Sequence, residues 1–162
     1  MPKYNVYKMY QEALGFLAAS NYLRYEISRN GTNLLPGAPA LTVNQSFACE
    51  LLLKSLYVIN GLDYEKRHKL KDLYYGLPKE TIEALKQRYH IKCEEELTKN
   101  NNLQLRKIDE CLEDYDNAFV DWRYYFENKS KSLCVSWVDF EILTDVLRNT
   151  VKDNLSIEYK KC

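Results

Sequence analysis

One uninterrupted helical repeat in the first half of the chain constrains the fold more than any other feature. In the segment 43–60 (VNQSFACELLLKSLYVIN), apolar or small residues recur at the three- and four-residue steps of an α-helix. Its other side is also largely apolar, which is typical of a helix at the centre of a bundle. Glu50 and Lys54 lie one turn apart on this helix and therefore share a face. Because ionised groups near a core are usually paired or functional, this pair is the first candidate for a site.

The rest of the chain carries further helical patterns. Amphipathic helices are predicted over 5–27 and from Pro78 to about His90, with a short segment of the same kind over 67–75. Asn60-Gly61 is a typical helix stop, so the central helix is predicted to end there.

A heptad-like pattern over 105–126 predicts a helix that lies along another helix for its whole length. The last helix, which includes Trp137, has a broad apolar face that fits either the protein's own core or a dimer seam. The stretch 30–39 is predicted to be a loop, and the polar stretch 94–102 a mobile one. These patterns together predict an all-α fold: one domain over 1–162, built as an up-and-down bundle of four long helices and one or two short ones.

Composition narrows the classes of function. The net charge is zero, which does not favour a strong electrostatic attraction of the whole chain to nucleic acid or to an anionic membrane. The five cysteines are widely spaced, and only two histidines accompany them, so neither zinc ligation nor any other cofactor is predicted. Neither a signal peptide nor an apolar run long enough to cross a bilayer is visible. We therefore expect a cytoplasmic protein with reduced thiols.

Two further polar sets accompany the charged pair on the central helix. His68 stands before a short helical stretch, with Asp72 one turn further on, where its carboxylate can orient the imidazole. Arg123 and Glu127 form the other set, on the heptad-like helix. If the helices pack antiparallel, the Glu50–Lys54 set and the Arg123–Glu127 set can meet beside one cavity. The alternative is an ion-pair network that only fixes the register of the helices.

Three segments together resemble the HEPN superfamily. They are FACELLLK at 47–54, RHKLKDL at 67–73 followed by Leu77-Pro78, and FVDWRYYFE at 119–127. Their order and their placement on helices agree with that family, and the resemblance extends from about residue 41 to residue 127.

HEPN domains are helical bundles, commonly homodimeric, and many belong to toxin–antitoxin, abortive-infection or CRISPR systems. Many cleave RNA; others bind nucleotides or act as non-catalytic partners. The ribonuclease members carry an arginine followed four to six residues later by a histidine, which moves protons at the ribose 2′-hydroxyl while the arginine stabilises the phosphorane. In this chain Asn128 stands where a histidine would follow Arg123. The resemblance therefore implies a bundle without the usual ribonuclease motif.

Our leading hypothesis is a homodimeric protein that binds RNA, a nucleotide or a partner protein such as an antitoxin. Lys54 and Arg123 would contact phosphate, and Tyr124 would stack on a base. The predicted ligand-binding side chains are Glu50, Lys54, Asp72, Tyr124 and Asn128. One alternative is an active, metal-independent ribonuclease, for which the predicted catalytic side chains are His68, Arg123 and Glu127. The other alternative is a non-catalytic oligomerisation module.

Overall fold

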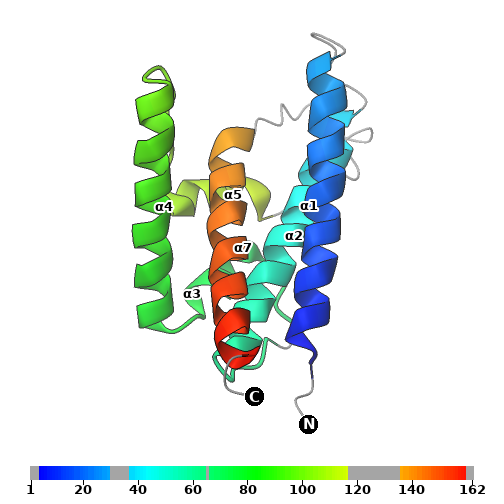
Figure 1. Cartoon of the computed structure of the whole chain (residues 1–162), viewed down its shortest axis with the longest axis vertical. Coiled ribbons are helices and arrows are strands. Elements are labelled where there is room, and N and C mark those ends of the chain that lie inside the picture. The colour runs from blue at the N-terminus through cyan, green and yellow to red at the C-terminus, as the bar shows by residue number, and fades with distance from the viewer. Residues whose placement is uncertain (1–3, 30–36, 65, 117–135, 160–162) are drawn as a thin grey trace.

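The chain folds as a bundle of antiparallel helices. The computed structural model describes residues 4–29, 37–64, 66–116 and 136–159, with side chains in the last segment as far as residue 155. The described residues form six helices and no strand: α1 (Val6–Arg29), α2 (Gly37–Ile59), α3 (Leu70–Tyr75), α4 (Lys79–Lys99), α5 (Ile108–Tyr115) and α7 (Trp137–Tyr159). Figure 1 shows α1 and α4 running in one direction and α2 and α7 in the other. The prediction of an all-α bundle is confirmed.

Helix α2 is the centre of this bundle, as its sequence predicts. Just over half of its 23 residues are buried. It packs against α1, α7 and α3, so apolar side chains are useful on most of its circumference. Leu52, Leu53 and Leu56 are each at most 1% exposed. The same core takes in side chains from the other five helices, which joins the described elements into one packed body.

One end of α2 agrees with the boundary predicted from the sequence, and the other end does not. Gly61 has a φ of 68° and follows the helix, while its N–H donates to the carbonyl of Val58 and the N–H of Leu62 donates to that of Tyr57. This is the Schellman arrangement, and it confirms the predicted stop. The start was predicted too late, because the helix already begins at Gly37. Pro39 does not prevent this, since the first-turn N–H groups have no partner within the helix.

Helix α4 is longer than its sequence suggested. The predicted end near His90 and the predicted mobile loop over 94–102 are wrong, because the helix continues to residue 99. Cys93 keeps one side buried against the core, while ion pairs such as Lys92–Glu95 (2.7 Å) join exposed neighbours on the other side. A run of polar residues was therefore the solvated face of a helix, not a loop.

Helix α5 is shorter than the predicted helix over 105–126. It begins at Ile108 and ends at Tyr115, and residues 117–135 lie outside the described part of the chain. Ile108, Leu112 and Tyr115 are buried, as the pattern predicts. In Figure 1, α5 runs across the direction of the long helices instead of along one of them.

Helix α7 resolves one of the alternatives left open by the sequence. Phe140, Leu143 and Leu147 are fully buried, and Ile142 and Val146, on the neighbouring stripe, are almost so. Both stripes of its apolar face therefore serve the protein's own core and not a dimer seam. None of the described helices combines the length and apolar character that crossing a bilayer requires.

Candidate functional site

Three of the predicted site residues meet at one carboxylate. The Glu50 Oε1 atom lies 2.6 Å from Lys54 Nζ and 3.0 Å from His68 Nδ1. The side chains of Glu50 and Lys54 are only 17% and 11% exposed, whereas that of His68 is 74% exposed. A half-buried ion pair therefore supports an imidazole that faces solvent. We call these three residues the Glu50 cluster.

A tyrosine of α2, Tyr57, fixes the loop that carries His68 because it binds Arg67, the residue before His68. Tyr57 is 2% exposed, and its hydroxyl accepts a hydrogen bond from Arg67 Nη1 at 3.2 Å. The guanidinium also lies over the Tyr57 ring, 5.8 Å from the centroid. Gly76 makes room for both groups, because a Cβ at this position would collide with the Tyr57 hydroxyl and the Arg67 guanidinium. The loop that carries His68 is thus fixed against α2.

The hydrogen bond to Glu50 determines which ring nitrogen of His68 is available. An ionised carboxylate can only accept, so Nδ1 donates its proton to Glu50. The other nitrogen, Nε2, is then on the part of the ring that faces solvent, where it can accept or exchange a proton. A carboxylate–imidazole pair of this kind is suited to binding a polar ligand and also to proton transfer.

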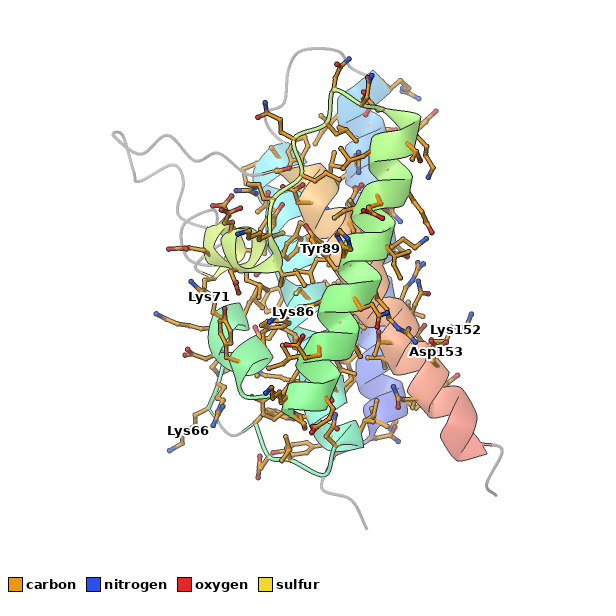
Figure 2. The ribbon with its side chains drawn as sticks, turned by 90° about the vertical axis from the view of Figure 1, so that its left-hand side faces the viewer. Lys66, Lys71, Lys86, Tyr89, Lys152 and Asp153 are labelled. Atoms are coloured by element: carbon orange, nitrogen blue, oxygen red, sulfur yellow. The ribbon has the colours of Figure 1, made fainter. Side chains whose placement is uncertain are left out.

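Several basic residues accompany His68, either next to it in the chain or in the Glu50 cluster. Lys54 Nζ also lies 5.1 Å from the centroid of the Tyr64 ring, which adds a cation–π contact to its ion pair. The backbone N–H of Lys71 donates to Asp116, the residue that follows α5, at 2.9 Å. Figure 2 shows Lys66 and Lys71 projecting from the edge of the bundle that carries α3. Lys66 also has a φ of 59°, an uncommon and strained conformation for a residue with a side chain.

The remaining predicted site residues are not part of this cluster. Asp72 is exposed on α3, and its carbonyl oxygen accepts a long hydrogen bond from the Tyr57 hydroxyl, 3.5 Å. The imidazole of His68 pairs with Glu50, so the predicted orienting role of Asp72 is wrong. The other four predicted residues lie outside the described part of the chain: Arg123, Tyr124, Glu127 and Asn128.

Sequence reasoning missed a second polar cluster, which contains one fully buried carboxylate. Arg106 Nε lies 2.9 Å from Asp139 and its Nη1 lies 2.6 Å from Asp114, while Asp139 is fully buried. Burial acts to lower the pKa of Arg106, but the hydrogen bonds and charges of the two carboxylates outweigh it and raise that pKa above its usual value. The available signal was Asp139 itself, an acidic residue within an apolar helix face.

A hollow beside α4 does not coincide with the Glu50 cluster, since none of its lining residues belongs to that cluster. It has a volume of about 540 Å³ and lies between α4 and residues 105–109, with Tyr89, Cys93 and Leu105 in its wall. His90 stands at its edge, where it pairs with Glu94 at 3.3 Å, a pair that sequence reasoning also missed. No group of three potential metal ligands occurs among the described residues.

Comparisons with known proteins leave the family of this chain undetermined. No family model matches the chain, and neither a curated protein nor a solved structure matches it. The likeness to the HEPN superfamily therefore remains a resemblance in three short segments.

Proposed function

We propose that this protein binds RNA or a nucleotide through phosphate, at the surface formed by the Glu50 cluster and the loop 66–69. The observation that carries this proposal is the pairing of a half-buried Glu50–Lys54 ion pair with the solvent-facing imidazole of His68. A charged group held near the core of a bundle and connected to a solvent-facing imidazole is typical of a binding or catalytic site.

The charges of the adjacent loop favour an anionic ligand. Lys66 and Lys69 are exposed, and neither is in an ion pair with another residue of the described segments. Arg67 is held by Tyr57, which leaves the two lysines on either side of it to contact phosphate. Because the chain has no net charge, we expect binding to depend on this local surface and to weaken strongly with salt.

The test is fluorescence anisotropy with a short labelled single-stranded RNA, complemented by calorimetric titration with a panel of nucleotides. Lys66→Glu/Lys69→Glu should weaken RNA binding and lower the slope of log affinity against log salt by roughly 1.4, about 0.7 for each lost phosphate contact. The matched control is Lys86→Glu/Lys99→Glu, the same charge change at exposed positions of α4. Equal loss in both variants, or no binding by the folded protein to any ligand, would refute the proposal.

A second candidate function is metal-independent cleavage of RNA. The specific observation in its favour is the hydrogen bond from His68 Nδ1 to Glu50, which leaves Nε2 to take a proton. In this reaction Nε2 accepts the proton of a ribose 2′-hydroxyl, whose oxygen attacks the adjacent phosphorus. The P–O5′ bond breaks, and the leaving oxygen takes a proton from water. The products are a 2′,3′-cyclic phosphate and a 5′-hydroxyl end, and the imidazolium returns its proton to solvent.

Cleavage is tested with labelled RNA in the presence of a chelator. His68→Ala should abolish it, and Glu50→Gln should slow it by about 10²-fold or more, because both changes remove a positioned proton acceptor or its support. His90→Ala is the matched control, since His90 is as exposed as His68 and its imidazole also pairs with a glutamate, in this case Glu94. Unchanged cleavage in His68→Ala would exclude this mechanism. A role in bacterial defence or in a toxin–antitoxin pair rests on the HEPN resemblance alone.

A further inference from the structure

The outer face of α1 carries an exposed row of tyrosines and small residues. Tyr7, Tyr22 and Tyr25 are 47%, 65% and 61% exposed, which places them among the most exposed large side chains of the described segments. The full row consists of Tyr7, Gln11, Gly15, Ala18, Tyr22, Tyr25 and Arg29, all of them exposed. At 3.6 residues per turn these positions fall within a quarter of the helix circumference. We call this row the α1 stripe.

The α1 stripe faces away from the rest of the bundle. The buried residues of α1 are Tyr10, Ala13, Ser20 and Ile27; the last three lie on the opposite side of the helix, and Tyr10 lies about a right angle away from the stripe. Among the described elements α1 packs almost entirely against α2, and Figure 1 shows it at the margin of the bundle. Tyrosine is enriched at protein interfaces, where its ring is buried and its hydroxyl stays hydrated.

Gly15 indicates that something outside the protomer approaches this face closely. It lies in the interior of a 24-residue helix, where glycine is destabilising relative to alanine. A Cβ at this position would meet no atom within 4 Å, so the packing of the protomer does not require a glycine here. Close approach by another backbone or by a large side chain is the usual reason for such a glycine.

The spacing of the stripe is self-complementary when the helix is reversed. With Ala18 on a two-fold axis, residue i of one copy lies opposite residue 36 − i of the other. Tyr22 then falls opposite position 14, one residue and about 1.5 Å along the axis from Gly15, so that the largest exposed side chain lies beside the smallest residue of the stripe. Tyr25 falls opposite Gln11, and Tyr7 falls opposite Arg29, whose cation can lie over the ring. A two-fold axis requires this kind of self-complementarity, in which residue i meets j and j meets i.

We infer that a second copy of this chain docks on the α1 stripe, so that the protein is an antiparallel homodimer through α1. The exposed fractions of the three tyrosines correspond to about 350 Å² per protomer, if a tyrosine buries roughly 200 Å² in full. Two protomers thus supply about 700 Å² from these rings. The other four stripe positions then raise the total toward the roughly 1,000 Å² that a specific interface needs. This inference is independent of the proposed function.

Sedimentation velocity of the full chain over a range of about 5 to 200 μM tests the association. The mass should rise from 19.2 kDa toward twice that value with increasing concentration. Tyr22→Glu/Tyr25→Glu should stay monomeric at every concentration, while Ile91→Glu, at an exposed apolar position of α4, should associate as the unmodified protein does. A monomeric protein at 200 μM, or a dimer unaffected by the double variant, would overturn the inference.

Two further variants test the register and exclude a folding defect as the cause. Gly15→Leu should weaken association at least tenfold without lowering the melting temperature of the protomer, because the new side chain has free space there. In a chain with Cys134→Ser and Cys162→Ser, mild oxidation should cross-link Ala18→Cys to its own copy. The neighbouring exposed position, Ala19→Cys, should not cross-link. Efficient cross-linking at residue 19 instead of residue 18 would refute this packing.

Discussion

The buried ion pair between Arg106 and Asp139 yields an asymmetric prediction for stability. The two residues share one hydrogen bond, 2.9 Å long, but their surroundings differ. Asp139 is fully buried, and its Oδ1 atom has no hydrogen-bond partner among the described residues. Arg106 is about one-third exposed and keeps a second carboxylate, Asp114, at 2.6 Å. Removing the cation should therefore be much worse than removing the buried anion.

The magnitudes follow from what each change leaves behind. Arg106→Met leaves a fully buried carboxylate without a cation, and loss of one partner from a buried pair costs about 3–5 kcal/mol. Asp139→Leu leaves Arg106 partly solvated and paired with Asp114, so the loss should be about 1–2 kcal/mol. The double variant removes both charges and should return to within about 2 kcal/mol of the unmodified protein.

Urea unfolding followed by circular dichroism measures these differences. With an m value of about 2 kcal/mol/M, the midpoint should fall by roughly 1.5–2.5 M in Arg106→Met and by less than about 1 M in Asp139→Leu. The control is Arg88→Met, which breaks the exposed Arg88–Asp153 pair (2.8 Å) and should cost less than about 1 kcal/mol. Equal losses in the two single variants, or additive losses in the double variant, would show that the reasoning about burial is incorrect.

Two more predictions concern the loop before α3 and the buried thiol and tyrosine hydroxyl groups of the core. Gly76→Ala should destabilise the fold by about 1–3 kcal/mol and weaken RNA binding, because its Cβ would displace the Tyr57 hydroxyl and the Arg67 guanidinium, which hold the loop that carries His68. Urea unfolding measures the first effect and fluorescence anisotropy the second. Unchanged stability and unchanged binding would contradict the role given to this glycine. Burial raises the pKa of the Cys49 and Cys111 thiols and of the Tyr74, Tyr89 and Tyr115 hydroxyls. These groups ionise near their ordinary pKa values only in the unfolded chain. The free energy of unfolding should therefore be unchanged below about pH 8.5, and each group should lower it by about 1.4 kcal/mol for every pH unit above its own ordinary pKa, about 8.5 for a thiol and about 10 for a tyrosine. Tyrosinate absorbance at 295 nm should therefore appear in two stages, the second together with loss of helix; a single titration of all tyrosines near pH 10 with helix retained would contradict the burial of these rings.

The helical content and the position of the central helix could be read from the sequence because they depend on local information. The repeat over 43–60 requires a helix with apolar residues on most sides, and only the middle of a bundle can cover such a helix. Its stop at Gly61 also depends on neighbouring residues alone. The predicted boundaries of α4 and α5 were wrong because the real boundaries depend on tertiary packing. Packing decides whether a polar stretch continues a helix and where a helix with a heptad-like pattern ends.

The composition of the site required the tertiary structure. Glu50 and Lys54 share a face by helical geometry alone, so the sequence was sufficient to identify them as a pair. His68 is 18 residues from Glu50, and local spacing favours Asp72, one turn away, as its partner. The ring pairs with Glu50 instead, beside the Tyr57–Arg67 contact that fixes the loop against α2. Arg106 and Asp139 are 33 residues apart, and no local pattern connects them. The periodicity of a sequence predicts which residues share a face within a few turns of one helix. Which charged residues of different helices come into contact depends on how the helices pack.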